Sequence, residues 1–303
     1  MVKNKKAIGF AGLIFIVAAV FTVIQAQTVP PALIVHPSNL EFGLEPGKTQ
    51  EGSLYVKNTT DKALSISTDL RNFSAEGEEG GVALTKENIP FSLASWIKIT
   101  PEKAEIAPNQ EVKFSYSVTP PTNAEAGGHF GSVVFGTVAP KNPGGAAVAQ
   151  EIATLFLVRI PGKVTETANI ESFEPDQNFY EFGPVKFNLR VKNTGGVHIK
   201  PAGVITLSDM LGHKTYIGFQ GENVLPQAVR KMSAMGKDKW LIGKYTADLS
   251  LSYGTANSQL HAASKFYAFP VRVGIAVLVV LFMLFLLRRR LSRSLKILLT
   301  GKQ

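Results

Sequence analysis

The sequence predicts an all-β protein made of two β-sandwiches and followed by a single transmembrane helix. Three observations lead to this prediction. Short segments of alternating apolar and polar side chains recur along the middle of the chain, with Gly, Pro and Asn clusters between them. No convincing helical pattern lies between the two ends. One long uncharged stretch near the C-terminus is followed at once by arginines.

The uncharged stretch near the C-terminus predicts the membrane span. Val273 to Leu287 is free of charges, and the span extends back to Phe269. As a helix, residues 269–287 would be roughly 28 Å long, which matches a hydrocarbon core of about 30 Å. A buried core helix is the alternative, but it would rarely combine this length and apolarity with a basic stop. The arginines from position 288 onward indicate a basic cytoplasmic tail, residues 288–303.

The tail itself has an amphipathic pattern. Leucines fall on one face of a predicted helix and basic residues on the other sides: Leu291, Leu295, Leu298 and Leu299 against Arg290, Arg293 and Lys296. Such a segment would lie on the anionic inner leaflet, so we expect attachment as its role.

A second apolar run lies at the N-terminus. Three lysines precede it, and it covers residues 7–24. An acceptable signal-peptidase site follows, with Ala26 just before the cut. Residues 1–26 are therefore interpreted as a signal peptide, with an uncleaved anchor as the alternative. Both export the middle of the chain. The chain has no cysteine, which excludes a lipoprotein anchor and a disulfide framework and suggests a bacterial envelope.

The positive net charge of the chain reflects membrane orientation. Three lysines lie in the leader and six basic residues follow Leu287; without these nine, 23 basic residues face 23 acidic ones. The exported region is thus neutral, and no nucleic acid partner is expected.

Residues 27–162 are predicted to form the first sandwich. Leu54 and Val56 alternate with polar neighbours, as do the apolar residues of 112–118, which indicates half-buried strands. The runs 132–138 and 152–160 are more uniformly apolar and predict central strands. The Gly and Ala stretch 144–149 between them is interpreted as a hairpin loop.

Residues 163–268 are predicted to form a second, related sandwich. The strand at 185–191 ends in Val-Lys-Asn-Thr-Gly, and a strand of the first half ends in Val-Lys-Asn-Thr-Thr at 56–60. This shared phrase hints at duplication. Further strands are expected at 203–207, 215–219, 241–253 and 260–266, in line with immunoglobulin-like sandwiches.

Several turn-and-strand segments of the first module form a recognisable series: Leu44–Gln50, Leu54–Asn58, Trp96–Pro101, Ile106–Pro108, Gln110–Val112, Pro120–Pro121 and Ala126–Gly131. In these segments the first module resembles the N-terminal, peptidoglycan-binding-type domain of the WxL-interacting surface proteins. Order and spacing agree over residues 37–160, while the second module matches the family only in its position.

The resemblance implies that the first domain contacts the peptidoglycan of the cell wall and that the second domain binds another surface protein. The residues alone imply two neutral sandwiches outside a membrane, whose strand edges could accept a partner strand. We therefore expect a membrane-anchored, non-catalytic bacterial surface protein that binds the wall, a surface protein or both. The alternative is a membrane-tethered accessory for assembly of surface or secreted proteins, in the manner of a chaperone.

An enzyme is the competing class, and the sequence offers little for one. No cofactor or metal motif is found among the histidines, which are His36, His129, His198, His213 and His261. His129 and Ser132 lie between glycines, and we expect those glycines to form a bulge or tight turn with His129 exposed. No catalytic, cofactor-binding or metal residue is predicted.

Three further features have simple structural explanations. Glu76, Glu78 and Glu79 lie among glycines and are expected to form a solvated loop rather than a calcium site. Trp96 is expected to anchor a core or sandwich rim. Trp240 is expected to begin a strand, and either tryptophan could instead be a glycan platform.

Overall fold

The computed structural model describes residues 31–138 and 150–300, with side chains described as far as Arg288. The predicted signal peptide, 1–26, and the loop 144–149 lie outside the described residues. The side chains of the predicted amphipathic tail also lie outside them.

The first sandwich is built from two sheets and a short 3₁₀ turn, η1 (Ala94–Trp96). Sheet A has the order β1 (Leu33–His36), β3 (Gln50–Asn58), β8 (Glu111–Val118), β6 (Ile97–Thr100). Sheet B has the order β2 (Asn39–Gly43), β10 (Glu151–Ile160), β9 (Gly127–Thr137), β4 (Leu64–Glu76), β5 (Gly81–Thr85), and β7 (Lys103–Ile106) also pairs with β4.

The second sandwich also has two sheets. Sheet C has the order β11 (Ala168–Pro175), β13 (Lys186–Asn193), β16 (Val229–Met235). Sheet D has the order β12 (Phe179–Tyr180), β18 (Ser258–Ala268), β17 (Gly243–Tyr253), β14 (Ala202–Ser208), β15 (Lys214–Gln220).

The two sandwiches share one topology. In each, a short strand near the start pairs in parallel with the last strand: β2 with β10, and β12 with β18. The strand order of sheet B then matches that of sheet D position for position. The structure confirms the predicted fold class, an all-β chain of two immunoglobulin-like sandwiches with one C-terminal apolar helix.

Alternating side chains form two separate cores. In β3, Leu54 and Val56 are buried between more exposed neighbours, and in β13 Phe187, Leu189 and Val191 are buried in the same way. Burying each such side chain stabilises the fold by about 1.5 to 3 kcal/mol. The strand predicted from position 241 begins at Gly243 instead, because the preceding residues form a loop. β9 and β10, which lie on either side of the undescribed residues 139–149, pair antiparallel.

The sequence motif shared by residues 56–60 and 191–195 has the same structural role in both sandwiches. Asn58 and Asn193 end β3 and β13 with fully buried side chains. The amide of Asn58 donates to the carbonyls of Lys62 and Ile106 at 2.6 and 3.0 Å, and its oxygen accepts from the N–H of Thr60. Asn193 bonds in the same manner to Val197 O, Val224 O and Gly195 N. Each amide thus ties its strand end to loops that would otherwise leave buried carbonyls unpaired.

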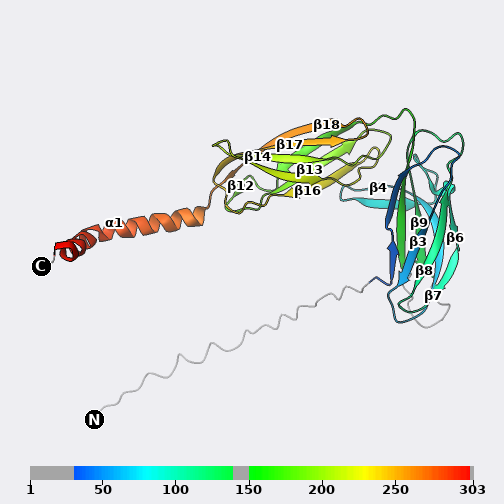
Figure 1. Ribbon diagram of the computed structural model, residues 1–303, viewed down its shortest axis with the longest axis horizontal. Helices are drawn as coiled ribbons and strands as arrows, with labels where there is room; N and C mark the ends of the chain where they lie inside the picture. The colour runs from blue at the N-terminus through cyan, green and yellow to red at the C-terminus, as the bar shows by residue number, and fades with distance from the viewer. Residues whose placement is uncertain (1–30, 139–149, 301–303) are drawn as a thin grey trace, which may run out of the picture.

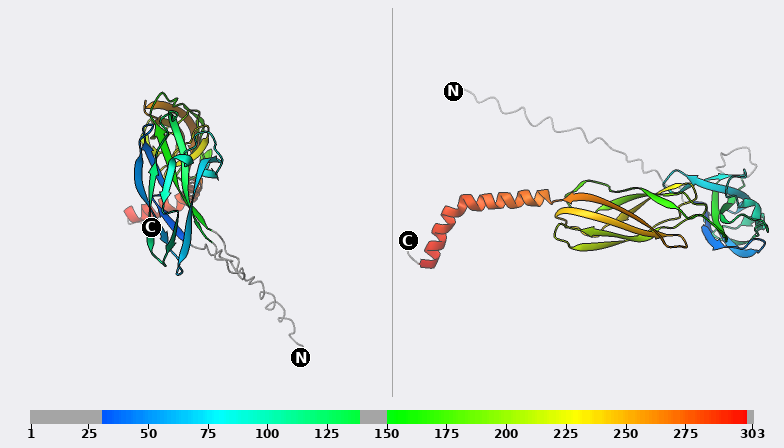
Figure 2. Two further views of the ribbon diagram at one scale, coloured as in Figure 1. Left: turned by 90° about the vertical axis from the view of Figure 1, so that its right-hand side faces the viewer. Right: turned by 90° about the horizontal axis from the view of Figure 1, so that it is seen from above.

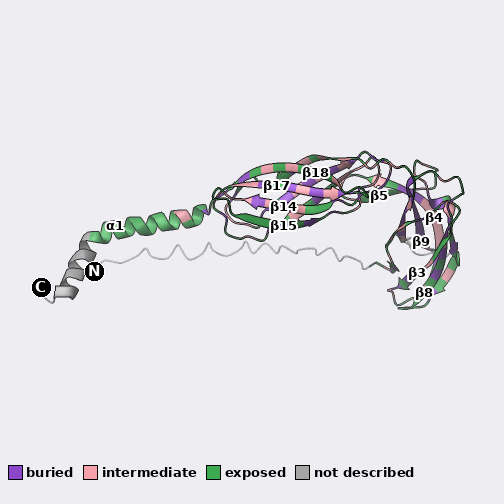
Figure 3. Cartoon of the chain, turned by 45° about the horizontal axis from the view of Figure 1, so that its top comes forward, coloured by how far each residue is buried: buried purple, intermediate pink, exposed green. Residues whose placement is uncertain are grey.

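The helix α1 (Val271–Thr300) follows β18 after two residues. Pro270 precedes its first turn and accepts the first helical bond, from Gly274, so the helix begins two residues later than position 269. Among the described residues, it is the one helix long and apolar enough to cross a membrane, over Val271–Arg288. Its side chains are exposed along this length (Figure 3).

The two sandwiches meet at a marked angle. The second sandwich and α1 lie along one line, and the first sandwich crosses that line at the far end (Figures 1 and 2). The tip of the β4–β5 hairpin reaches from the first sandwich towards β16 of the second, so the joint is more than the short connection between β10 and β11.

Replacing Asn193 by Ala should lower the free energy of unfolding by about 3 kcal/mol, because two carbonyls and one N–H lose their partners in the interior. Asn58→Ala should have a similar effect. The control is Asn169→Ala on the exposed side of β11. Denaturant unfolding of the detergent-solubilised chain measures the difference; an equal, small loss in all three variants would contradict the assigned role.

Candidate binding cleft between the two sandwiches

The outer face of sheet B is unusually apolar near the second sandwich. Phe73, Phe130 and Leu157 form a buried cluster there, separate from the core of the first sandwich. Leu225 of the second sandwich packs against it, with Val82, Leu84, Phe91 and Leu155 around it. This second layer explains why the run 152–160 is apolar on both faces: Phe156 and Val158 pack inside the sandwich, and Leu155 and Leu157 pack at the joint.

The backbones of the two sandwiches touch at Gly128. Its N–H donates to the carbonyl of Gly196 at 2.9 Å. A Cβ at position 128 would lie 3.1 Å from Cα of Val197, so a larger residue would force the sandwiches apart. The expectation of a bulge or tight turn at these glycines is wrong, because β9 pairs with β10 in unbroken register from Gly127 onward. The glycines admit the neighbouring backbone instead.

The hairpin tip forms the second contact of the joint. Arg190 donates to Glu78 through Nε at 2.6 Å and also through its terminal nitrogen, and Lys231 N–H donates to Glu78 O at 2.8 Å. Lys231 Nζ lies 2.9 Å from Glu79 Oε1. The Arg190 hydrogen bond holds the pKa of Glu78 below its usual range. Glu76 and Glu79 are exposed, as expected for a solvated loop, but Glu78 is half-buried and binds Arg190 of β13.

A third contact joins β2 to two segments of the second sandwich. His198 Nε2 lies 3.0 Å from Glu41 Oε1, and Asn223 Nδ2 donates to Glu41 Oε2 at 3.1 Å. Burial would raise the pKa of Glu41, but the hydrogen bonds from Asn223 and His198 hold it below its ordinary value of 4.5. Burial lowers the pKa of His198 from 6.5 and outweighs the opposing hydrogen bond to Glu41. Neutral His198 therefore donates to Glu41 through Nε2.

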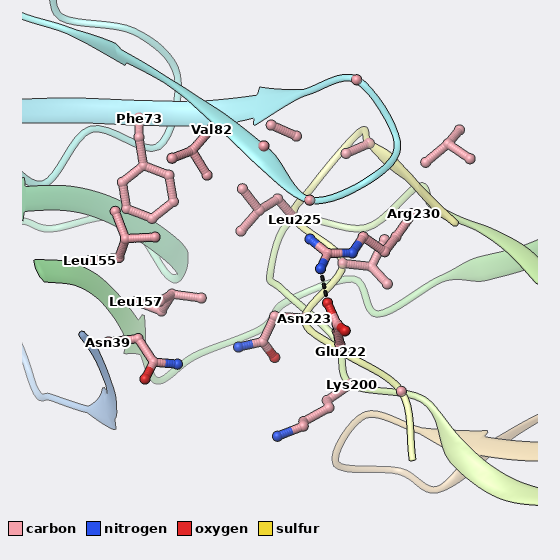
Figure 4. Close-up of a pocket in the computed structure, with 18 of the residues that line it drawn as sticks. Asn39, Phe73, Val82, Leu155, Leu157, Lys200, Glu222, Asn223, Leu225 and Arg230 are labelled. Atoms are coloured by element: carbon pink, nitrogen blue, oxygen red, sulfur yellow. Dashed lines mark ion pairs between the residues drawn. The ribbon is translucent and has the colours of Figure 1, made fainter. Parts of the chain in front are cut away.

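A cleft of about 500 Å³ remains between the outer face of sheet B and the loops of the second sandwich. Figure 4 shows its apolar wall, where Phe73, Val82, Leu155 and Leu157 face Leu225. The side formed by the second sandwich carries most of the polar groups, which are Lys200, Gln220, Glu222, Asn223 and Arg230. Asn39 lies beside Leu155 on sheet B. A concave site with an apolar wall and a few convergent polar groups is typical of a binding site.

The polar side of the cleft carries both charge and unused hydrogen-bonding capacity. Arg230 pairs with Glu222, while Lys200 is exposed at the mouth. Within the described residues, Asn223 Oδ1 and Arg230 Nε are buried and have no hydrogen-bond partner. Both atoms are closed to water, so a ligand in the cleft would meet the exposed polar groups instead: Gln220, Glu222 and Lys200.

His129 and Ser132 do not form a catalytic pair. They lie three positions apart on a continuous strand and so face opposite sides of sheet B. His129 is buried, not exposed as expected; its ring nitrogens lie 3.2 and 3.0 Å from the carbonyls of Ser92 and Glu125. The Ser132 hydroxyl donates to the carbonyl of Arg71. Within 31–138 and 150–288, no group of three or more acidic or histidine side chains could hold a metal ion.

The two tryptophans have different environments. Trp96 is half-buried against the first core, with its ring 4.4 Å from that of His129, which confirms the expected anchor. Trp240 is 61% exposed and lies in the loop before β17, so it does not begin a strand. Phe182 contacts it edge-on. Neither tryptophan lines the cleft.

The cleft residues were not predicted from the sequence. Lys200, Asn223 and Arg230 lie in loops or at a strand start with no recognisable motif, and Glu41 is far from them along the chain. One signal was present in the sequence. The run at 152–160 is apolar on both faces, which implies that the outer face of its sheet is covered, and the second sandwich covers it at Leu155 and Leu157.

Comparisons with known proteins add little to this geometry. No protein-family model matches the chain, and no curated protein matches it. Similar solved structures include the class 5 fimbriae chaperone CfaA, with 11% identity, a TM-score of 0.40 and coverage of 77% of this chain and 98% of that chain. The YadV chaperone has 9% identity, a TM-score of 0.38 and coverage of 78% and 100%.

The CupB2 chaperone of Pseudomonas aeruginosa has 10% identity, a TM-score of 0.36 and coverage of 77% and 100%. At these scores the likeness carries no argument about function. The evidence for the fold class is the arrangement of the four sheets, and the evidence for the candidate site is the cleft.

His198 should make stability depend on pH between 6.5 and 4.5, the ordinary pKa values of His and Glu. Below 6.5 the unfolded chain gains a proton at His198 that the folded chain does not take up, so stability falls as the pH falls. Glu41 has a lowered pKa in the folded chain, so its contribution to folding stability is lost only when the pH falls below 4.5. His198→Gln keeps a donor for Glu41 without the titration, so the difference in unfolding free energy between the two proteins should shrink from pH 7 to 5. A difference that is constant over this range would contradict the assignment.

Proposed function

We propose that this chain is a non-catalytic binding protein of the bacterial envelope, anchored by α1 with both sandwiches outside the membrane. Its interdomain cleft takes a segment of another envelope protein. The observation that carries the proposal is the cleft itself, with its apolar wall on sheet B and the Lys200, Asn223 and Arg230 groups opposite.

The chemistry of the cleft favours a polypeptide over a glycan. A polypeptide segment offers apolar side chains for the half-buried Val82, Leu155 and Leu225. Its backbone groups can bond to the exposed polar side chains of the cleft, which are Gln220, Glu222 and Lys200. Glycans are commonly held on exposed aromatic faces, but Trp96 is packed against His129 and Trp240 lies outside the cleft. The exposed Lys200 at the mouth favours a segment with a carboxylate.

The resemblance to the WxL-interacting surface proteins adds a second proposed ligand, peptidoglycan, which the first sandwich would contact. The described surface supports a protein ligand more strongly, because residues of both sandwiches line the cleft. A chaperone-like accessory would use the same cleft, but would hold many unfolded clients in place of one folded partner.

Photo-crosslinking in intact cells tests whether a protein segment binds in the cleft. Benzoylphenylalanine at Lys200, at the mouth of the cleft, should give one discrete protein adduct. The matched control is Lys113, an exposed position on the outer face of sheet A, which should give none. Adducts to wall glycan, or identical adducts from both positions, would refute a protein ligand in the cleft. Many heterogeneous adducts of nascent proteins at Lys200 alone would favour the chaperone-like function.

The lack of cysteines permits a direct test of orientation. Single cysteines at Lys113 and Lys302 should behave differently towards a membrane-impermeant maleimide added to cells with permeable outer layers. The Lys113→Cys chain should be labelled and the Lys302→Cys chain should not, until detergent opens the membrane. Basic residues flanking a span remain on the inner side. Labelling of Lys302→Cys in closed cells would reverse the topology.

A further inference from the structure

The helix α1 is fastened to the second sandwich without a linker. Phe269 N–H donates to the carbonyl of Tyr180 at 2.9 Å, and Pro270 is buried. In the first turn, Arg272 N–H donates to Glu181 Oε1 at 2.7 Å, and Arg272 Nε lies 3.3 Å from Glu181 Oε2. A carboxylate at this position satisfies a free N–H and complements the helix dipole. The helix therefore leaves the sandwich in a fixed direction.

This attachment sets how far the second sandwich can stand from the lipid. The apolar window Val271–Arg288 has 18 residues, about 27 Å of helix, so all of it is needed to cross a hydrocarbon core of about 30 Å. From Ala268 to Val271 the chain can extend at most about 10 Å. The headgroup layer is about 5 to 7 Å thick on each side. The end of the sandwich must then lie in or against the headgroups.

That end of the sandwich carries an exposed apolar surface, which we call the base. Strand registers place its residues together: Phe179 pairs with Tyr267 at the end of β18, and Gly243 pairs with Ala268. The β14–β15 turn is at the same end, because Ser208 pairs with Thr246. The large exposed apolar side chains of the base are Phe179, Met210, Leu211, Trp240, Ile242, Tyr267 and Phe269.

The chemistry of the base matches a membrane interface. Met210 and Leu211 are 70% and 78% exposed, and Ile242 is 59% exposed, so water contacts most of their surface in the isolated chain. Tryptophan and tyrosine prefer the headgroup level, where an apolar ring and a polar tip are both satisfied. Lys237 and Lys239 precede Trp240 in the same loop, and both are exposed, so they can reach lipid phosphates.

We propose that the base is a lipid-contact surface that inserts into the headgroup region of the membrane crossed by α1. This inference rests on the membrane anchoring proposed above. The base adds a second attachment, which together with the Glu181 contact keeps the second sandwich upright and sets the height and direction of the cleft. Exposed apolar surface of this kind on an exported domain requires a cover, and the lipid is within reach of every residue named.

Tryptophan fluorescence in vesicles tests the proposal, because the chain has two tryptophans and one lies in the base. The full chain with Trp96→Phe would be reconstituted into phosphatidylcholine and phosphatidylglycerol vesicles with brominated acyl chains. Trp240 emission should fall roughly twofold relative to unbrominated vesicles, since interfacial side chains reach about 5 to 10 Å into the boundary. Shallow bromines should quench more than deep ones.

The control is Trp240→Phe, which retains Trp96 in the first sandwich and should show no quenching. If Trp96→Phe impairs folding, the difference between the unsubstituted chain and Trp240→Phe gives the same signal. Vesicle flotation separates the two levels of failure: a chain that does not float lacks the membrane anchor, whereas a floating chain with unquenched Trp240 overturns the lipid contact. If Trp240 emission shifts with protein density but is not quenched by bromine, the base contacts a second copy of the chain. That result would also overturn the lipid contact.

Discussion

The apolar outer face of sheet B is the constraint on which the arrangement of the molecule depends. A sandwich normally leaves that face to water, but here Phe73, Phe130 and Leu157 require a cover. Burial of apolar surface is worth roughly 25 cal/mol per Å², which favours docking of the second sandwich through Leu225. The glycine at 128 then allows backbone contact. The cleft is the part of this joint that the docking leaves open, which is why its wall is apolar on one side only.

The sequence predicts the fold well wherever local alternation is enough. Strands such as β3, β8 and β13 have one face in the core and one in water, so a period of two identifies them. The short strands β2 and β12 escaped prediction because two to five residues show no reliable period, and their pairing with the last strand of each sandwich is a tertiary event. Asn58 and Asn193 were noticed as a shared phrase, whereas their buried amide networks depend on distant loops.

The candidate site lay beyond sequence reasoning because every contact in it is long-range. Glu78 looked like a solvated residue among glycines, and Arg190 like an ordinary polar position of an alternating strand; they are 112 residues apart. His198 and Glu41 are 157 apart. Local patterns assign a charged residue to water by default, and only the docking of the two sandwiches decides which charges find partners. The apolar run at 152–160 indicates that the outer face of its sheet is covered, but it does not identify the segment that covers it.

Charge and apolarity are distributed along the molecule in the order that anchoring requires. Residues 27–287 are neutral overall, so the proposed lipid contact depends on where side chains lie rather than on net charge. At the base, lysines surround apolar tips, which suits an interface with anionic headgroups. At the cleft, Lys200 and Arg230 face an apolar wall, which suits a polypeptide. Because Glu181 fastens α1 to one end of the second sandwich and Leu225 fastens the first sandwich near the other, lipid contact at the base would orient the cleft outward, towards the partner that it is proposed to bind.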